Sequence, residues 1–288
     1  MRLVTGIVVA LAAGAAGAVW AQAQKAGVVP PGDWQTINRD VAATRYSPLT
    51  QINTSNVANL KLAWSFPMQG GGTSVPLAVN GILYISNGGR VTAMDGESGM
   101  EVWSFSTSGA TPTPLATDAQ AQPPAAPGAP VAARGRGGRG GGAPQVSARG
   151  VEYWPGDGKL APRILFLTGT RLWAIDAQTG KPAEGFGENG SVAIGVSAGG
   201  VPSIYRNVAI VGASSTENPQ EGNAIGNPRA FDVVTGKKLW EFQTVPKAGE
   251  KYNETWGPNG WQNRQGTNMW GFAAPIDYDR GIAYLPIA

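Results

Sequence analysis

The chain has 288 residues, of which 42% are hydrophobic and only 14% charged, and its formal net charge is +3. It contains no cysteine and no histidine, which excludes disulfides, thiolate nucleophiles, Cys-x-x-Cys-His haem attachment, histidine metal ligands and a Ser-His-Asp triad. The small net charge argues against a nucleic-acid partner. Because cysteine and histidine are absent, any chemistry is expected to rest on a bound cofactor and a hard metal ion held by carboxylate or amide oxygens.

Residues 1–23 are predicted to be a secretory signal peptide. Arg2 supplies a positive charge, the following residues to Ala21 are apolar, and Ala21-Gln22-Ala23 fits the small-x-small cleavage pattern. The apolar run is nearly long enough to span a bilayer, so an uncleaved N-terminal membrane anchor is the alternative. Cleavage would leave the mature chain in a bacterial periplasm or secreted.

Residues 82–103 contain the first copy of an internal repeat. An apolar strand at 82–85 is followed by Asp95, then by Ser98, Gly99 and Trp103 at the third, fourth and eighth positions after the aspartate. The carboxylate can accept hydrogen bonds from turn amides, and the glycine can adopt the positive φ that closes the turn. This spacing predicts two antiparallel strands joined by a tight turn, with Trp103 as a large packing residue.

Residues 107–148 interrupt the repeat. The segment is rich in Ala, Pro and Gly, has no aromatic residue, and includes an Arg-Gly run at 134–142. It offers few apolar side chains to offset the entropy of ordering, so we predict a disordered, mobile insert between two units. Arg-Gly repeats can bind RNA, but a solvated linker is the favoured interpretation for an exported chain.

The repeat pattern recurs twice, each time after an apolar strand: residues 164–167 precede 176–180, and residues 208–211 precede 232–236. The third copy ends in Trp240, as the spacing requires. The second copy has Glu184 at that place, and Phe186 is expected to take the apolar role. Each unit is an antiparallel sheet too small to be stable alone, so the repeat predicts sheets stacked around an axis as in a β-propeller.

The repeated unit Ala-x-Asp-x-x-[Ser/Thr]-Gly-x-x-x-Trp resembles the tryptophan-docking motif of PQQ-dependent quinoproteins. The same resemblance to quinoprotein glucose and alcohol dehydrogenases extends over 33–106 and 149–288, through segments at 33–34, 45–49, 51–53, 60–64, 149–154, 268–270, 277–279 and 284–286. It implies an all-β, eight-bladed propeller, of which residues 33–288 would form about four blades.

The resemblance also implies a function. Family members hold PQQ near the propeller axis on Ca²⁺ or a similar ion and oxidise a sugar or an alcohol by hydride transfer, with a quinone or cytochrome as electron acceptor. The family's catalytic aspartate is expected beyond Ala288, so we assign no catalytic residue in this chain and leave open whether it is an enzyme by itself. On this interpretation the chain is a truncated product, a split gene or a fragment of the N-terminal half.

Five residues match positions that contact the cofactor or its metal ion in the family. The resemblance assigns Arg149, Ser214 and Trp270 to PQQ binding, and Glu217 and Asn218 to the metal ion. For each residue a structural alternative stays open: a loop charge, a polar strand end, a core tryptophan or a solvated loop carboxylate.

The sequence departs from the family pattern in ways that leave the substrate open. Trp154 stands where membrane glucose dehydrogenases have histidine, and the adjacent cysteine pair of methanol and ethanol dehydrogenases is absent. Residues 196–202 lack the usual Thr-Ser-x-Pro, which weakens one cofactor contact. Two other functions remain for such a chain, a non-catalytic propeller scaffold and a carbohydrate-binding propeller, and open blade edges favour self-association.

Overall fold

The computed structural model describes residues 29–68, 74–107, 145–213, 226–262, 269 and 273–287. Within these ranges the chain forms strands, and its helical content is limited to two single 3₁₀ turns, Val57–Asn59 (η1) and Asn253–Trp256 (η2). The expected all-β architecture is therefore confirmed. No helix in the described ranges is long and apolar enough to cross a membrane, and the predicted signal peptide at 1–23 lies outside them.

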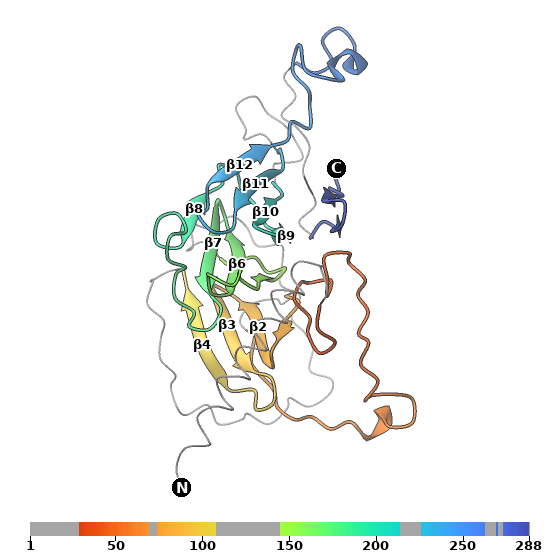
Figure 1. Cartoon of the computed structure of the whole chain (residues 1–288), viewed down its shortest axis with the longest axis vertical. Coiled ribbons are helices and arrows are strands. Elements are labelled where there is room, and N and C mark those ends of the chain that lie inside the picture. Colours follow the sequence, from red (N-terminus) through yellow and green to blue (C-terminus); the bar gives the residue numbers. More distant parts are fainter. Residues whose placement is uncertain are drawn as a thin grey trace, which may run out of the picture.

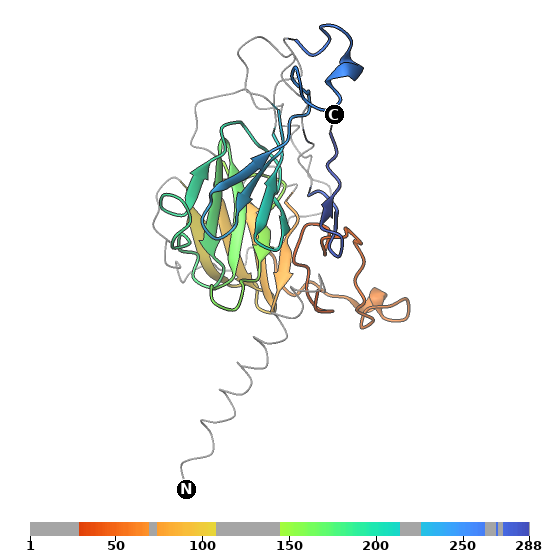
Figure 2. The same cartoon turned by 45° about the horizontal axis from the view of Figure 1, so that its top comes forward.

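Three four-stranded antiparallel sheets follow one another along the chain and lie side by side (Figures 1 and 2). Neighbours in the sequence are neighbours in each sheet. The first contains β1 (Leu77–Val79), β2 (Ile82–Asn87), β3 (Arg90–Asp95) and β4 (Glu101–Ser106); the second β5 (Glu152–Trp154), β6 (Arg163–Thr168), β7 (Arg171–Asp176) and β8 (Ser191–Ala193); the third β9 (Ser203–Tyr205), β10 (Val208–Val211), β11 (Arg229–Asp232) and β12 (Lys238–Glu241). A fourth sheet consists of β13 (Ile276–Asp277) and β14 (Ile282–Ala283).

The repeated turns have the predicted geometry. The Asp95 carboxylate accepts hydrogen bonds from the Ser98 amide and hydroxyl, both at 2.7 Å, and the equivalent aspartates of the second and third sheets bind their threonine amides at 2.7 and 2.6 Å. The turn glycines have φ values of 71°, 69° and 76°. Only a residue without a side chain adopts these angles at low cost, which explains the fixed position of glycine in the motif.

Each turn glycine also lies against an aromatic side chain of the preceding unit. A Cβ atom placed on Gly180 would lie 2.6 Å from the Trp103 ring, and Trp103 Nε1 donates to the Ala177 carbonyl at 3.1 Å. Trp64 approaches Gly99 in the same way. In the next unit the buried Phe186 lies beside Gly236, so it takes the place of the missing tryptophan, as predicted.

Two hydrophobic cores fill the spaces between the sheets, one between the first and second and one between the second and third. The middle sheet is covered on both faces, and every residue of its strand β6 is buried. This strand begins at Arg163, whose guanidinium donates to the carbonyls of Val233 and Val234 at 2.8 and 2.7 Å. The second and third units are thus joined by a buried cation as well as by apolar packing.

The end of the predicted insert belongs to the described fold. Val146 is buried and forms an isolated bridge with Thr168, and the Ser147 amide donates to the Leu167 carbonyl at 2.9 Å. Residues 145–148, which composition assigned to the insert, therefore belong to the folded part of the chain. The remainder of the insert, 108–144, lies outside the described residues.

The N-terminal segment and the C-terminal hairpin lie on the same side of the three sheets (Figures 1 and 2). Trp34 and Ala78 exchange backbone hydrogen bonds of 2.6 and 3.0 Å, which attaches the segment to β1. The Ile276 amide of β13 donates to the Val41 carbonyl at 2.6 Å. The N-terminal segment thus pairs with β1, and the C-terminal hairpin is joined to the N-terminal segment.

Candidate cofactor site

The first strands of the sheets approach each other at one end. Val75, just before β1, forms a parallel bridge with Gly150, just before β5, and β5 in turn lies beside β9. The loops that lead into β5 and β9 are joined by a hydrogen bond of 2.9 Å from the Ser147 hydroxyl to the Gly199 carbonyl. Loops at the ends of inner strands are where propellers place their central sites, and this end is the candidate cofactor site.

Arg149 lies in this cluster of loops, half-buried in the turn that opens β5. Its amide donates to the Ser147 hydroxyl at 3.3 Å, and the next residue, Gly150, has a φ of 128°. A Cβ atom on Gly150 would lie 3.2 Å from the Val75 carbonyl oxygen, so the turn is tightly fitted against β1. The sequence-predicted cofactor arginine therefore stands on a well-supported turn at the site.

The other predicted residues lie outside the described ranges, but their neighbours do not. Ser214, Glu217 and Asn218 follow β10, where the description stops at Ala213, and Trp270 follows Met269 directly. A Cβ atom on Gly212 would lie 3.1 Å from Met269 Cβ and 3.2 Å from the Met269 carbonyl oxygen. The chain leading to Ser214 thus lies against the chain leading to Trp270.

The donor set suits the groups that the resemblance implies. A guanidinium such as that of Arg149 pairs well with carboxylates, of which PQQ carries three. The oxygens of Glu217 and Asn218 are ligands of the kind Ca²⁺ prefers. No group of three or more acidic, histidine or cysteine side chains that could hold a metal ion occurs in the described part of the chain, which does not include these two residues.

The loop at 196–202, which lacks the family's Thr-Ser-x-Pro, is held by apolar packing and by backbone hydrogen bonding. Val196, Ala198 and Val201 are buried in the core between the second and third sheets or beside it, so apolar packing fixes this loop. The Ala198 amide also donates to the Gly169 carbonyl at 2.8 Å. The hydroxyl of Ser147, which precedes β5, also donates to the Gly199 carbonyl of this loop.

Sequence reasoning missed one buried acid close to this site. Glu152 lies in β5, three residues after Arg149, and only 2% of its surface is exposed. Its Oε2 atom has no hydrogen-bond partner among the described residues, and burial raises the pKa of the Glu152 carboxyl well above its usual range. The available signal was an acid inside an otherwise apolar strand, between Val151 and Tyr153.

The sequence model of one protein family, described as the β-propeller domain of PQQ glucose/ethanol/alcohol dehydrogenases, matches residues 34–288. The chain belongs to this family. The match includes all the described sheets and the five predicted site residues, so the expected membership of the PQQ-dependent dehydrogenases is confirmed.

Individual members of this PQQ family agree with that assignment. The chain is 32% identical over 262 residues to the dehydrogenase subunit of a quinone alcohol dehydrogenase of Gluconobacter oxydans (strain 621H), and the alignment covers 82% of this chain and 30% of the relative. The chain therefore spans less than a third of the length of that curated relative.

Solved structures share the fold of this family member. The quinohemoprotein alcohol dehydrogenase ADHIIG of Pseudomonas putida HK5 superposes with a TM-score of 0.62 and 23% identity, over 89% of this chain and 34% of its own. A europium-containing methanol dehydrogenase gives a TM-score of 0.54 and 24% identity, over 84% of this chain and 40% of its own. The predicted quinoprotein-type propeller fold is confirmed, with three four-stranded sheets and one two-stranded sheet in the described part of the chain.

Proposed function

We propose that this chain forms one part of the cofactor cradle of a PQQ-dependent dehydrogenase that oxidises an alcohol or a sugar. The observation that carries the proposal is the convergence of Arg149, at the start of β5, with loops from the neighbouring units, together with the close approach of Gly212 and Met269. Bound PQQ supplies the two-electron acceptor of the reaction.

The residues of this chain have separate roles in that cradle. The Arg149 guanidinium pairs with a carboxylate or polarises a quinone oxygen at the edge of the ring, and the Ser214 hydroxyl binds a second carboxylate. Trp270 provides a flat apolar surface for the ring. Glu217 and Asn218 bind the metal ion, with Ca²⁺ as the proposed occupant. The base that removes the substrate's hydroxyl proton is not assigned to a residue of this chain.

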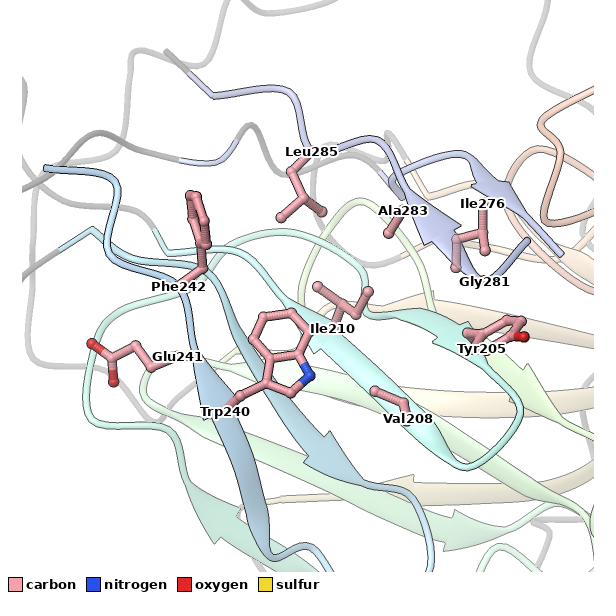
Figure 3. A pocket seen from close by; sticks show the side chains of 10 residues that line it. All are labelled: Tyr205, Val208, Ile210, Trp240, Glu241, Phe242, Ile276, Gly281, Ala283 and Leu285. Atoms are coloured by element: carbon pink, nitrogen blue, oxygen red, sulfur yellow. The ribbon is translucent and has the colours of Figure 1, made fainter. Parts of the chain in front are cut away.

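The cellular setting and partners follow from the same proposal. We infer a periplasmic or secreted protein after removal of residues 1–23, and electron transfer to a quinone or a cytochrome. Self-association is proposed because the third sheet presents Trp240 and Phe242 at its open face, where they line a cavity of about 500 Å³ against the β13–β14 hairpin (Figure 3).

The cradle is tested by calorimetric titration of the full chain with PQQ in the presence and absence of Ca²⁺. We expect Ca²⁺-dependent binding, weakened at least tenfold in Trp270→Ala at every Ca²⁺ concentration because ring stacking is lost. In Glu217→Gln, excess Ca²⁺ should restore part of the affinity because only metal binding is impaired. Two matched controls should bind PQQ normally: Trp261→Ala, in a half-buried turn, and Glu188→Gln, at an exposed position.

Two results would contradict the proposal. A wild-type chain that folds but binds no PQQ with Ca²⁺ would favour a propeller scaffold or a carbohydrate-binding propeller. A Glu217→Gln chain with unchanged Ca²⁺ dependence would show that this carboxylate is a loop residue and not a metal ligand.

A further inference from the structure

Five buried polar side chains line one small cavity beside the candidate cofactor site. They come from three separate parts of the chain: the N-terminal segment, strand β5 and strand β9. The residues are Thr36, Asn38, Asp40, Glu152 and Ser203, and each is at most 9% exposed. The cavity is about 10 Å³, close to the smallest volume that holds one water-sized guest.

The N-terminal part of the lining is held in place by its own hydrogen bonds. Asp40 forms an ion pair with Arg39 at 3.2 Å and also accepts hydrogen bonds from the amide, at 3.0 Å, and the hydroxyl of Thr44. The Thr36 hydroxyl donates to the Asp40 carbonyl at 3.3 Å and accepts from the Asn38 amide at 3.1 Å. The charge of Asp40 is therefore already balanced.

The remaining lining oxygens are fixed but not saturated. The Asn38 side-chain oxygen accepts a hydrogen bond of 2.8 Å from Arg45 Nε, and the Ser203 hydroxyl oxygen accepts one of 2.6 Å from the Ala274 amide. Amide and hydroxyl oxygens each have a second lone pair, so both can still coordinate a guest.

Glu152 differs from these residues because no described side chain of the lining forms an ion pair with it. Within the described ranges no hydrogen bond reaches its Oε2 atom, and Asp40 is the only other titratable side chain among the described lining residues. The remaining described lining residues carry no charge; they are Thr36, Asn38, Val41, Ser203, Ile204, Ala273, Ala274 and Ile276. An isolated ionised carboxylate in such surroundings is strongly unfavourable, so either a proton or a cation must compensate it.

We propose that this cavity binds one small monovalent cation, coordinated by Glu152 together with neutral oxygens of the lining. Among the described side chains that line the cavity, the Asp40 carboxylate is paired with Arg39, and Arg45 is bound to the Asn38 side-chain oxygen. Glu152 is therefore the one unpaired carboxylate of the lining, and a single monovalent ion matches its charge. Hard oxygen donors suit sodium or potassium. The bound ion would tie the N-terminal segment to β5 and β9, behind the turn that carries Arg149. It shares no residue with the proposed calcium ligands and does not depend on PQQ binding.

The test is thermal unfolding of the full chain in sodium, potassium or choline chloride at equal ionic strength and neutral pH, with a chelator present to remove divalent ions. We expect sodium or potassium to raise the midpoint above that in choline by about 3 °C at ten times the dissociation constant. The difference between the two inorganic ions identifies the preferred one. The ion effect should vanish in Glu152→Gln and persist in Glu97→Gln, which removes the same charge at an exposed turn.

Several outcomes would overturn the proposal. These are equal midpoints in all three salts and an ion effect that survives in Glu152→Gln. If Glu152→Gln does not fold, Glu152→Asp provides the test, because its shorter carboxylate should weaken the ion effect. In the wild type, the ion effect should also decline as the pH falls, because protons compete for the carboxylate. An ion effect that grows on acidification would contradict the assignment.

Discussion

At the scale of single residues, the turn glycines make two contributions that can be separated by mutation. Gly180 has a positive φ of 69° and also lies against the Trp103 ring, where a Cβ atom would approach to 2.6 Å. Gly185 has a similar φ of 75° but no atom within 4 Å of an added Cβ. Comparing these two positions isolates the contact with tryptophan from the backbone strain.

We predict that Gly180→Ala lowers the free energy of unfolding by about 1–3 kcal/mol more than Gly185→Ala does. Both substitutions strain the backbone, but only the first displaces a packed tryptophan that joins two sheets. Urea unfolding followed by circular dichroism gives both values. Equal losses at the two positions would mean that the sheets accommodate the added methyl group without cost.

Glu241 is expected to make stability depend on pH. Partial burial raises the pKa of this carboxyl, but hydrogen bonds from Asn227, Arg229 and Lys238 outweigh burial and lower the pKa to about 2. Since this is below the usual value of 4.5, the stabilisation is complete above pH 4.5 and is lost as the pH falls toward 2. Glu241→Gln should therefore show a smaller loss of unfolding free energy between pH 5 and pH 3 than the wild type. Glu254→Gln, an exposed control, should behave like the wild type, and identical slopes for all three proteins would refute the prediction.

At the scale of elements, the boundary of the insert decides which residues can be removed. The Ala/Pro/Gly-rich composition predicts that the segment is dispensable, whereas Val146 and Ser147 contact Thr168, Leu167 and Gly199. Replacing 109–144 with a Gly/Ser linker should leave the free energy of unfolding nearly unchanged. Extending the deletion through residue 148 should cost about 2 kcal/mol or more, because a buried valine and its backbone pairing are lost. Equal stability of the two deletions would show that 145–148 add nothing to the fold.

At the scale of the whole molecule, the third sheet presents an aromatic residue, Trp240, that packs against no turn glycine in the described part of the chain. Trp64, Trp103 and Phe186 each lie beside a turn glycine, whereas none of the described glycines has Trp240 among its nearest contacts. Trp240 is 39% exposed and borders the cavity facing β13 and β14 (Figure 3). An uncovered aromatic face of this kind favours association with a second copy.

We therefore predict concentration-dependent self-association of the full chain, measured by sedimentation velocity. Trp240→Glu should shift the equilibrium toward the monomer by at least tenfold, because a charge would be buried in the contact. Gln178→Glu adds the same charge at an exposed turn and should have no effect. A wild type that is monomeric at all concentrations would exclude this contact.

Dye reduction with PQQ and Ca²⁺ is expected to stay at background in the monomer.

The sequence determined those parts of the protein that depend on short-range contacts. The Asp-x-x-[Ser/Thr]-Gly turns could be predicted because the aspartate binds amides three residues away, and because the glycine angle is a property of that residue alone. The repetition of this unit, with Trp103 and Trp240 at the same offset, was enough to predict stacked sheets. Phe186 could be predicted as a substitute because its place in the repeat was already fixed. The assignment of Arg149 to PQQ binding rests on its match to a family motif and stays a prediction.

Only the tertiary structure decided which distant segments meet. The approach of Gly212 to Met269 and the hydrogen bond between Ser147 and Gly199 join parts of the chain whose spacing carries no periodic signal. The burial of Glu152 depends on the N-terminal segment folding over β5, so the sequence around residue 152 does not show that its carboxyl lacks a partner. Local patterns fix the hydrogen bonds within a unit, whereas burial and charge balance depend on what the rest of the chain places beside it.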